Sequence, residues 1–86
     1  MPTISRFFGI VISMYFDDHA PPHFHARYGQ DKAQFRIDPP GLLEGELPPR
    51  ALGLVMEWAR LHRDDLVADW KRAQMGEPLA DIEPLV

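Results

Sequence analysis

The residues best suited to chemistry lie together in one short segment. Three of the four histidines fall between positions 19 and 25, within the run Asp18-His19-Ala20-Pro21-Pro22-His23-Phe24-His25. His23 and His25 stand two residues apart, so a β-strand would place both imidazoles on one face, with Cα atoms about 7 Å apart. Imidazoles at this spacing can converge on one small target.

A divalent metal ion is the first candidate target. Zinc takes nitrogen and oxygen ligands at about 2.0–2.1 Å, and His23, His25 and either Asp18 or His19 could supply them. A coordination position left open would suit hydrolysis. The pattern alone assigns no cofactor, because His-x-His is common on strands and the spacing does not fix the remaining ligand.

A phosphodiester is the second candidate target, with RNA as the substrate class. Histidines that titrate near neutral pH can act as general base and general acid, and a nearby arginine could stabilise the charge that develops on the phosphate. The candidate catalytic residues are then His23, His25, Arg27 and Arg36, and the candidate binding residues are His19, Lys32 and Gln34.

A purely structural role also explains these residues. A histidine can donate to a backbone carbonyl at the end of a strand, and Pro21-Pro22 can simply stiffen a turn. The polar face can equally be a partner-binding surface or a solvated face of a sheet. Whether the protein is an enzyme is therefore open on sequence grounds.

The histidines belong to a predicted β-hairpin over residues 23–38. Its two strands, 23–28 and 32–38, alternate apolar and polar residues and flank a three-residue loop, Gly29-Gln30-Asp31. One face then carries the apolar residues Phe24, Ala26, Tyr28, Ala33, Phe35 and Ile37. The opposite face collects His23, His25, Arg27, Lys32, Gln34 and Arg36.

Further strands complete a small antiparallel sheet of three to five strands. Residues 9–16 are rich in β-branched and aromatic side chains, which indicates a central strand with Tyr15 and Phe16 in the core. Residues 3–8 favour another short strand, and residues 42–46 favour a short edge strand.

Helical periodicity begins at Pro48-Pro49, since proline is well tolerated at the first helical position. Apolar stripes that include Trp58 and Trp70 predict that both tryptophans pack in the core. One helix over residues 49–75 would be about 40 Å long, more than the roughly 25 Å span of so small a domain. We therefore expect two helices with a break near His62-Arg63, where His62 is a capping residue.

The chain is expected to form one α+β domain over residues 1–86, because a chain of 86 residues is too short to divide into two cores. Residues 1–47 form its β-rich half and residues 48–76 form the two C-terminal helices that pack against the sheet. Residues 77–86 form an extended C-terminal tail that docks on the domain.

Composition excludes several classes of protein. The absence of cysteine removes disulfides, thiolate chemistry and cysteine-ligated zinc. No apolar run reaches the length of about 18 residues that a membrane span needs, and the start of the chain lacks the features of a signal peptide. A cytoplasmic location without membrane contact is therefore expected. The net charge of -4 argues against a broadly basic nucleic-acid binder, but all of it falls in residues 44–86 and leaves residues 1–43 neutral.

Several segments resemble one known family. They are residues 1–10 (MPTISRFFGI), 14–19 (MYFDDH), 21–25 (PPHFH), 47–52 (LPPRAL), 57–58 (EW) with 62–63 (HR), and 76–79 (GEPL). Together they are similar to the bacterial domain-of-unknown-function family numbered forty-one sixty, over essentially the whole chain. The histidine–proline motif of Asp18, His19, Pro21, Pro22, His23 and His25 is a specific part of this resemblance.

The resemblance implies a small, prokaryotic, cytoplasmic protein. Members of the family are often encoded beside another small domain of unknown function, which implies a two-gene toxin–antitoxin module with this family as the toxin. The resemblance supplies no catalytic residues that could be carried over to this chain.

We therefore expect a toxin-like component that acts through the polar hairpin face, on RNA or translation, and is neutralised by a small protein partner, the antitoxin. The rival is a non-enzymatic binding module whose acidic helical half, around Asp64, Asp65 and Asp69, contacts a partner. The third hypothesis is a metal-dependent hydrolase that uses the histidine cluster with zinc or manganese. The oligomeric state, and whether the tail covers the hairpin face, are left open.

Overall fold

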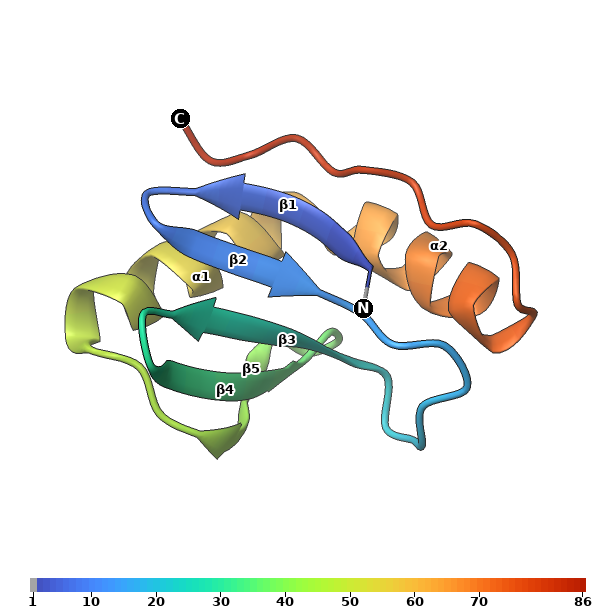
Figure 1. Cartoon of the computed structure of the whole chain (residues 1–86), viewed down its shortest axis with the longest axis horizontal. Coiled ribbons are helices and arrows are strands. Elements are labelled where there is room, and N and C mark those ends of the chain that lie inside the picture. Colours follow the sequence, from blue (N-terminus) through green and yellow to red (C-terminus); the bar gives the residue numbers. More distant parts are fainter. Residues whose placement is uncertain (1) are drawn as a thin grey trace.

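The computed structural model describes residues 2–86, so Met1, the first residue of the expected domain, lies outside the described range. The described residues form five strands followed by two helices (Figure 1). In chain order these are β1 (Thr3–Phe7), β2 (Ile10–Ser13), β3 (His23–Tyr28), β4 (Asp31–Arg36), β5 (Gly41–Gly45), α1 (Pro49–Leu61) and α2 (Arg63–Gln74). The predicted α+β class, with a small antiparallel sheet and two C-terminal helices, is confirmed.

The sheet is an antiparallel meander. Its spatial order, β1-β2-β3-β4-β5, is also the order along the chain. The register pairs Ile12 with Ala26 and Ala26 with Ala33, so these apolar side chains share one face. Ser13 follows Ile12, His25 precedes Ala26, and Ser13 and His25 pair with each other. Their side chains therefore lie on the opposite face.

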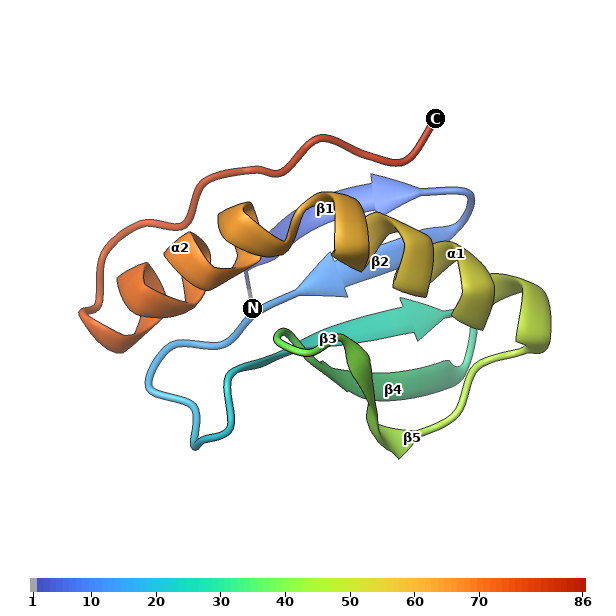
Figure 2. The same cartoon turned by 180° about the vertical axis from the view of Figure 1, so that it is seen from behind.

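Both helices lie against the apolar face of the sheet, and the opposite face carries no helix (Figure 1 and Figure 2). The core between sheet and helices is centred on Trp58, which is fully buried. Its ring centroid lies 5.3 Å from that of Phe7 and 5.7 Å from that of Phe24. Trp58 therefore packs in the core as predicted, whereas Trp70 is only partly buried against it.

The hairpin of β3 and β4 turns more tightly than predicted. Tyr28 pairs directly with Asp31, which leaves a two-residue turn, Gly29-Gln30, with Gly29 at a φ of 61°. The predicted three-residue loop is wrong by one residue, because a glycine at positive φ permits the shorter turn. Tyr28 is on the predicted face but 40% exposed, since its ring packs against Gly9, which offers no side chain to cover it.

A break at His62 separates the two helices, as predicted. The His62 backbone N–H donates to the Trp58 carbonyl at 3.0 Å, and its ring Nδ1 lies 3.4 Å from Asp65 Oδ2. One continuous helix over residues 49–74 would be about 39 Å long. The longest extent of the backbone is 33 Å, so the break keeps both helices within the length of the molecule. Among residues 2–86, neither α1 nor α2 combines the length and apolarity needed to cross a membrane.

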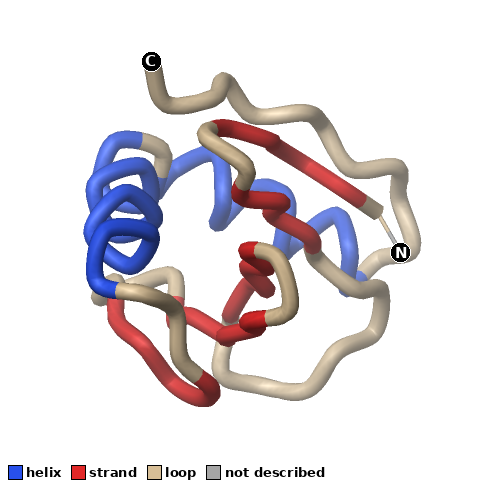
Figure 3. The backbone as a smooth tube through the Cα atoms, turned by 60° about the vertical axis from the view of Figure 1, so that its left-hand side comes forward, coloured by secondary structure: helices blue, strands red, loops and turns tan. Residues whose placement is uncertain are grey.

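The C-terminal tail, residues 77–86, runs along the outer edge of the sheet (Figure 1 and Figure 3). Ile82 donates its backbone N–H to the Ile4 carbonyl in β1 at 2.8 Å. The side chains of Ile82 and Leu85 are buried, and the Trp58 indole donates to the Glu83 carbonyl at 2.8 Å. The tail therefore lies beside β1 and leaves the helix-free face of the sheet uncovered.

Candidate functional site

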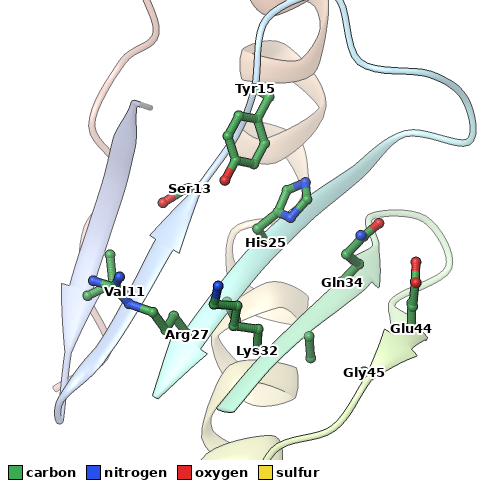
Figure 4. A pocket seen from close by; sticks show the side chains of 11 residues that line it. Val11, Ser13, Tyr15, His25, Arg27, Lys32, Gln34, Glu44 and Gly45 are labelled. Atoms are coloured by element: carbon green, nitrogen blue, oxygen red, sulfur yellow. The ribbon is translucent and has the colours of Figure 1, made fainter. Parts of the chain in front are cut away.

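The helix-free face of the sheet, here called the open face, carries most of the predicted polar residues. Alternation along β3 directs His25 and Arg27 to this face, and the register places Ser13 opposite His25 and Lys32 opposite Arg27. These residues surround a hollow of about 300 Å³ (Figure 4). Its polar and charged lining residues are Ser13, Tyr15, His25, Arg27, Lys32, Gln34 and Glu44.

The charges around this hollow favour an anionic ligand. Arg27 and Lys32 are both exposed and face each other across β3 and β4, while Glu44 contributes a carboxylate from β5. His25 can add positive charge when it is protonated. Two cations therefore outweigh one carboxylate in the lining of the hollow.

Three of the predicted catalytic and binding residues do not line the hollow. The Arg36 Nε donates to the Pro39 carbonyl at 3.1 Å, beside the turn that follows β4. His19 lies on the loop before β3 with its side chain 82% exposed, and His23 is 2% exposed. The predicted residues that line the hollow are His25, Arg27, Lys32 and Gln34.

His23 is a buried imidazole whose Nδ1 must carry a proton. Nδ1 lies 2.7 Å from the Pro21 carbonyl oxygen, and a carbonyl only accepts hydrogen bonds. The ring packs against Trp70, with centroids 5.3 Å apart. Nε2 lies 2.9 Å from Asp18 Oδ2, but the contact is not aligned with the N–H direction. Buried Nε2 therefore has no hydrogen-bond partner within residues 2–86.

Asp18 brings its carboxylate to both strand histidines. Oδ2 lies 2.9 Å from His23 Nε2 and 3.4 Å from His25 Nε2, and Oδ1 accepts the His19 backbone N–H at 2.9 Å. Helix α2 holds this loop, because the Gln74 amide donates to the Asp18 carbonyl at 3.1 Å. Burial raises the pKa of Asp18, but the hydrogen bonds from His19 and His25 and the nearby histidine charges lower it by more. The carboxyl group is therefore ionised at neutral pH.

His25 connects this carboxylate to the hollow. It lines the hollow, and its Nε2 lies 3.4 Å from Asp18 Oδ2. The Tyr15 ring meets the imidazole edge-on, with centroids 4.4 Å apart and an interplanar angle of 85° (Figure 4). Burial lowers the pKa of His25 by more than the hydrogen bond to Asp18 raises it. At pH 7 the ring is therefore mostly neutral, the form that accepts a proton or binds a metal.

Three of the four predicted metal-ligand candidates converge. One ligand atom from each of Asp18, His23 and His25 lies within 4.8 Å of the other two, and we call these residues the Asp–His cluster. His19 is not part of the cluster, because its Nδ1 lies 2.9 Å from the other Asp18 oxygen, Oδ1. The cluster stands where β3 begins, at the end of the hollow that His25 lines.

Comparison with known protein families matches residues 9–71 to the family described as Domain of unknown function (DUF4160). The matched segment covers well over half of the chain and contains both the hollow and the Asp–His cluster. The chain belongs to this family. The predicted resemblance is thereby confirmed. Neither a search of curated proteins nor a search of solved structures found a match to the chain.

Tyr15, Ser13 and Glu44 are lining residues of this DUF4160 protein that the sequence analysis does not predict. The expectation that Tyr15 and Phe16 belong to the strand core is wrong, because Tyr15 lines the hollow and Phe16 is 44% exposed beyond the end of β2. Strict alternation of side chains between the two faces of the sheet, continued from residue 10 to residue 15, predicts the position of Tyr15 correctly. The buried apolar residues are Ile10, Ile12 and Met14, and the residues between and after them, Val11, Ser13 and Tyr15, line the hollow.

Asp69, which was expected on a partner-binding surface of the helical half, is fully buried in this DUF4160 protein. Its Oδ1 accepts hydrogen bonds from Arg72 at 2.7 Å and from the Ala80 backbone N–H at 2.9 Å. Asp69 therefore joins α2 to the tail, and the predicted acidic surface keeps only Asp64 and Asp65. The sequence does not reveal this burial, because the covering segment lies about ten residues further along the chain.

Proposed function

We propose that this DUF4160 protein is a toxin-like component that binds the phosphodiester backbone of RNA in the hollow on its open face. The observation that carries the proposal is the juxtaposition of Arg27 and Lys32 in this hollow, on a face that neither the helices nor the tail cover. Proteins commonly hold single-stranded nucleic acid in a cationic groove with aromatic side chains beside it. Tyr15 supplies an aromatic ring at the edge of the hollow.

Local charge supports this proposal better than net charge does. The net charge of -4 would repel a polyanion if it were spread evenly. All of the acidic excess lies in residues 44–86. Half of it is Glu44 and Glu46, at the end of β5, and the other half lies in the helices and the tail taken together. An RNA strand that approaches the open face would meet Arg27 and Lys32 in the hollow, where Glu44 is the one acidic lining residue.

The geometry favours RNA binding over a two-histidine cleavage mechanism. His25 borders the hollow and can accept a proton from a ligand there, and Arg27 can stabilise negative charge on a phosphate. His23 is buried against Trp70 and does not line the hollow. His25 is therefore our candidate for any proton transfer, and Arg27 and Lys32 are our candidates for phosphate contacts.

In this proposal a small protein partner neutralises the toxin by covering the open face. Arg27 and Lys32 are exposed and would pair with acidic side chains of such a partner. The family resemblance and the uncovered face support this arrangement. The partner and the RNA would then compete for one surface.

Growth of a bacterial host after induction of the protein without its partner tests the proposal. We expect wild-type protein to slow growth and the double variant Arg27→Gln, Lys32→Gln to restore it, because both side chains are exposed and their removal leaves the core intact. The matched control is Arg50→Gln, Arg60→Gln, which removes the same charge from exposed positions on α1 and should still slow growth. Circular dichroism checks that each variant is folded. Harmless wild-type protein, or equal relief by the control, would refute the proposal.

A further inference from the structure

The Asp–His cluster has the separations of a metal site. Asp18 Oδ2 lies 2.9 Å from His23 Nε2 and 3.4 Å from His25 Nε2. Donor atoms that surround one ion at about 2.0–2.1 Å stand about 2.9–3.4 Å apart at octahedral or tetrahedral angles. Both separations from the carboxylate already match this range. The remaining pair of ligand atoms lies within 4.8 Å and can close by a small rotation of the less buried His25 ring.

The buried Nε2 of His23 is the atom that a cation would satisfy. Its Nδ1 proton is committed to the Pro21 carbonyl, so a neutral His23 presents a lone pair at Nε2. Nε2 and Asp18 Oδ2 lie 2.9 Å apart, so their lone pairs are close together without a hydrogen bond between the two atoms. A positive ion between the two atoms converts this unfavourable contact into two coordinate bonds.

Neighbouring groups orient the residues of the Asp–His cluster through hydrogen bonds, as they do for the ligands of known metal sites. Metal-binding histidines usually donate their other ring N–H to a carbonyl or carboxylate, as His23 does to Pro21. The other oxygen of Asp18 accepts the His19 backbone N–H at 2.9 Å, which orients the carboxylate. Gln74 from α2 fixes the same loop through the Asp18 carbonyl. The His23 ring and the Asp18 loop are therefore held in place before any ion binds.

We propose that Asp18 Oδ2, His23 Nε2 and His25 Nε2 bind one divalent transition-metal ion, for which Zn²⁺ is the best match. Two imidazoles and one carboxylate suit Zn²⁺ and its first-row neighbours, whereas Mg²⁺ and Ca²⁺ prefer oxygen ligands throughout. His25 binds as the neutral imidazole, in the tautomer that carries its proton on Nδ1 and leaves the Nε2 lone pair for the ion. Because His25 also lines the hollow, the proposed site borders the hollow on the open face. This inference does not depend on RNA binding.

Isothermal titration calorimetry of untagged, chelator-treated protein with zinc chloride tests the proposal. We expect one ion per chain with micromolar or tighter affinity. Asp18→Asn and His25→Ala each remove one ligand from a partly exposed position. We expect each to weaken zinc binding by about 100-fold or more, because loss of a group that only orients a ligand typically costs about 10–100-fold. The matched controls are His62→Ala and Asp65→Asn, from a His–Asp pair with the same 3.4 Å separation, and both should bind like wild type. His19→Ala should also retain binding.

Nitrogen NMR of the histidine rings provides a readout that does not rely on variants. Metal-free protein should show His23 protonated at Nδ1 and bare at Nε2, and zinc should shift the Nε2 resonances of His23 and His25 while leaving those of His62 in place. Folded protein that binds no zinc would overturn the proposal, as would unchanged affinity in Asp18→Asn and His25→Ala. A His23 ring protonated at both nitrogens and unaffected by zinc would also overturn it, because it would identify the contact with Asp18 as an ion pair.

Discussion

One carboxylate oxygen links α2 to the C-terminal tail. Asp69 Oδ1 accepts hydrogen bonds from Arg72 in the next turn of the helix and from the backbone of Ala80 in the tail. Asp69 is fully buried, and Oδ2 makes no hydrogen bond within residues 2–86. The hydrogen bonds at Oδ1 therefore have to offset the free-energy cost of burying the whole carboxylate charge.

We predict that Asp69→Ala lowers the free energy of unfolding by about 1–3 kcal/mol, because it leaves Arg72 and the Ala80 N–H without their acceptor. Urea denaturation followed by tryptophan fluorescence measures the change. Asp64→Ala, which removes a 92% exposed carboxylate from the same helix, is the control and should change stability by less than about 0.5 kcal/mol. Equal stability of the two variants would show that the Asp69 contacts contribute nothing.

The sequence predicts the residues of the Asp–His cluster but not their arrangement. The i, i+2 spacing places His23 and His25 on one side of β3, and local geometry is enough for that conclusion. The position of Asp18 depends on a proline-containing loop that Gln74 of α2 holds. The burial of His23 depends on Trp70, from the same helix. Both contacts join segments about 50 residues apart, and no local pattern contains them.

At the scale of elements, the pairing of β4 with β5 depends on a close approach at Gly45. This residue has a φ of 78° and ends β5. A Cβ at Gly45 would collide with the Lys32 carbonyl oxygen, which accepts the Glu46 backbone N–H at 3.2 Å. The glycine therefore keeps the edge strand in register beside the hollow.

We predict opposite effects for the same substitution at two glycines. Gly45→Ala should lower the free energy of unfolding by at least about 1–2 kcal/mol, the cost of a left-handed backbone for an L-residue, before the collision with Lys32 is added. Gly53→Ala, in the middle of α1 with nothing near the added methyl group, should raise it by about 0.5–1 kcal/mol. Thermal denaturation of both variants checks the signs, and a stabilising Gly45→Ala would contradict the assignment.

Elements with strong local patterns could be predicted, and elements that depend on a turn or on tertiary contacts could not. Alternation identifies the strands around residues 23–38, and the length of the molecule explains the break at His62. The two-residue turn at Gly29-Gln30 depends on the positive φ of Gly29. The residue types in the loop are compatible with a turn of either two or three residues, so they do not predict its length. The aromatic character of Tyr15 predicts a place in the core, but the alternation that begins in β2 directs its side chain into the hollow.

At the scale of the whole molecule, the charge that lines the hollow differs in sign from the net charge of the chain. The hollow on the open face is lined by Arg27, Lys32 and one carboxylate, Glu44. The two helices hold four acidic and five basic residues, and the tail holds three acidic residues. The tail follows β1 at the edge, so the open face stays accessible to a large ligand. Under the proposed function, Arg27 and Lys32 would hold a polyanion in the hollow although the net charge of the chain is -4.

The most direct test of the account measures binding of a fluorescein-labelled single-stranded RNA by fluorescence anisotropy over a range of salt concentrations. Contacts from Arg27 and Lys32 to two phosphates predict that log K falls with log salt with a slope of about -1.4. Arg27→Gln, Lys32→Gln should abolish both the binding and the slope, and the control Arg50→Gln, Arg60→Gln should retain both. The same affinity and slope in the two double variants would contradict the claim that the hollow on the open face is the working surface of this protein.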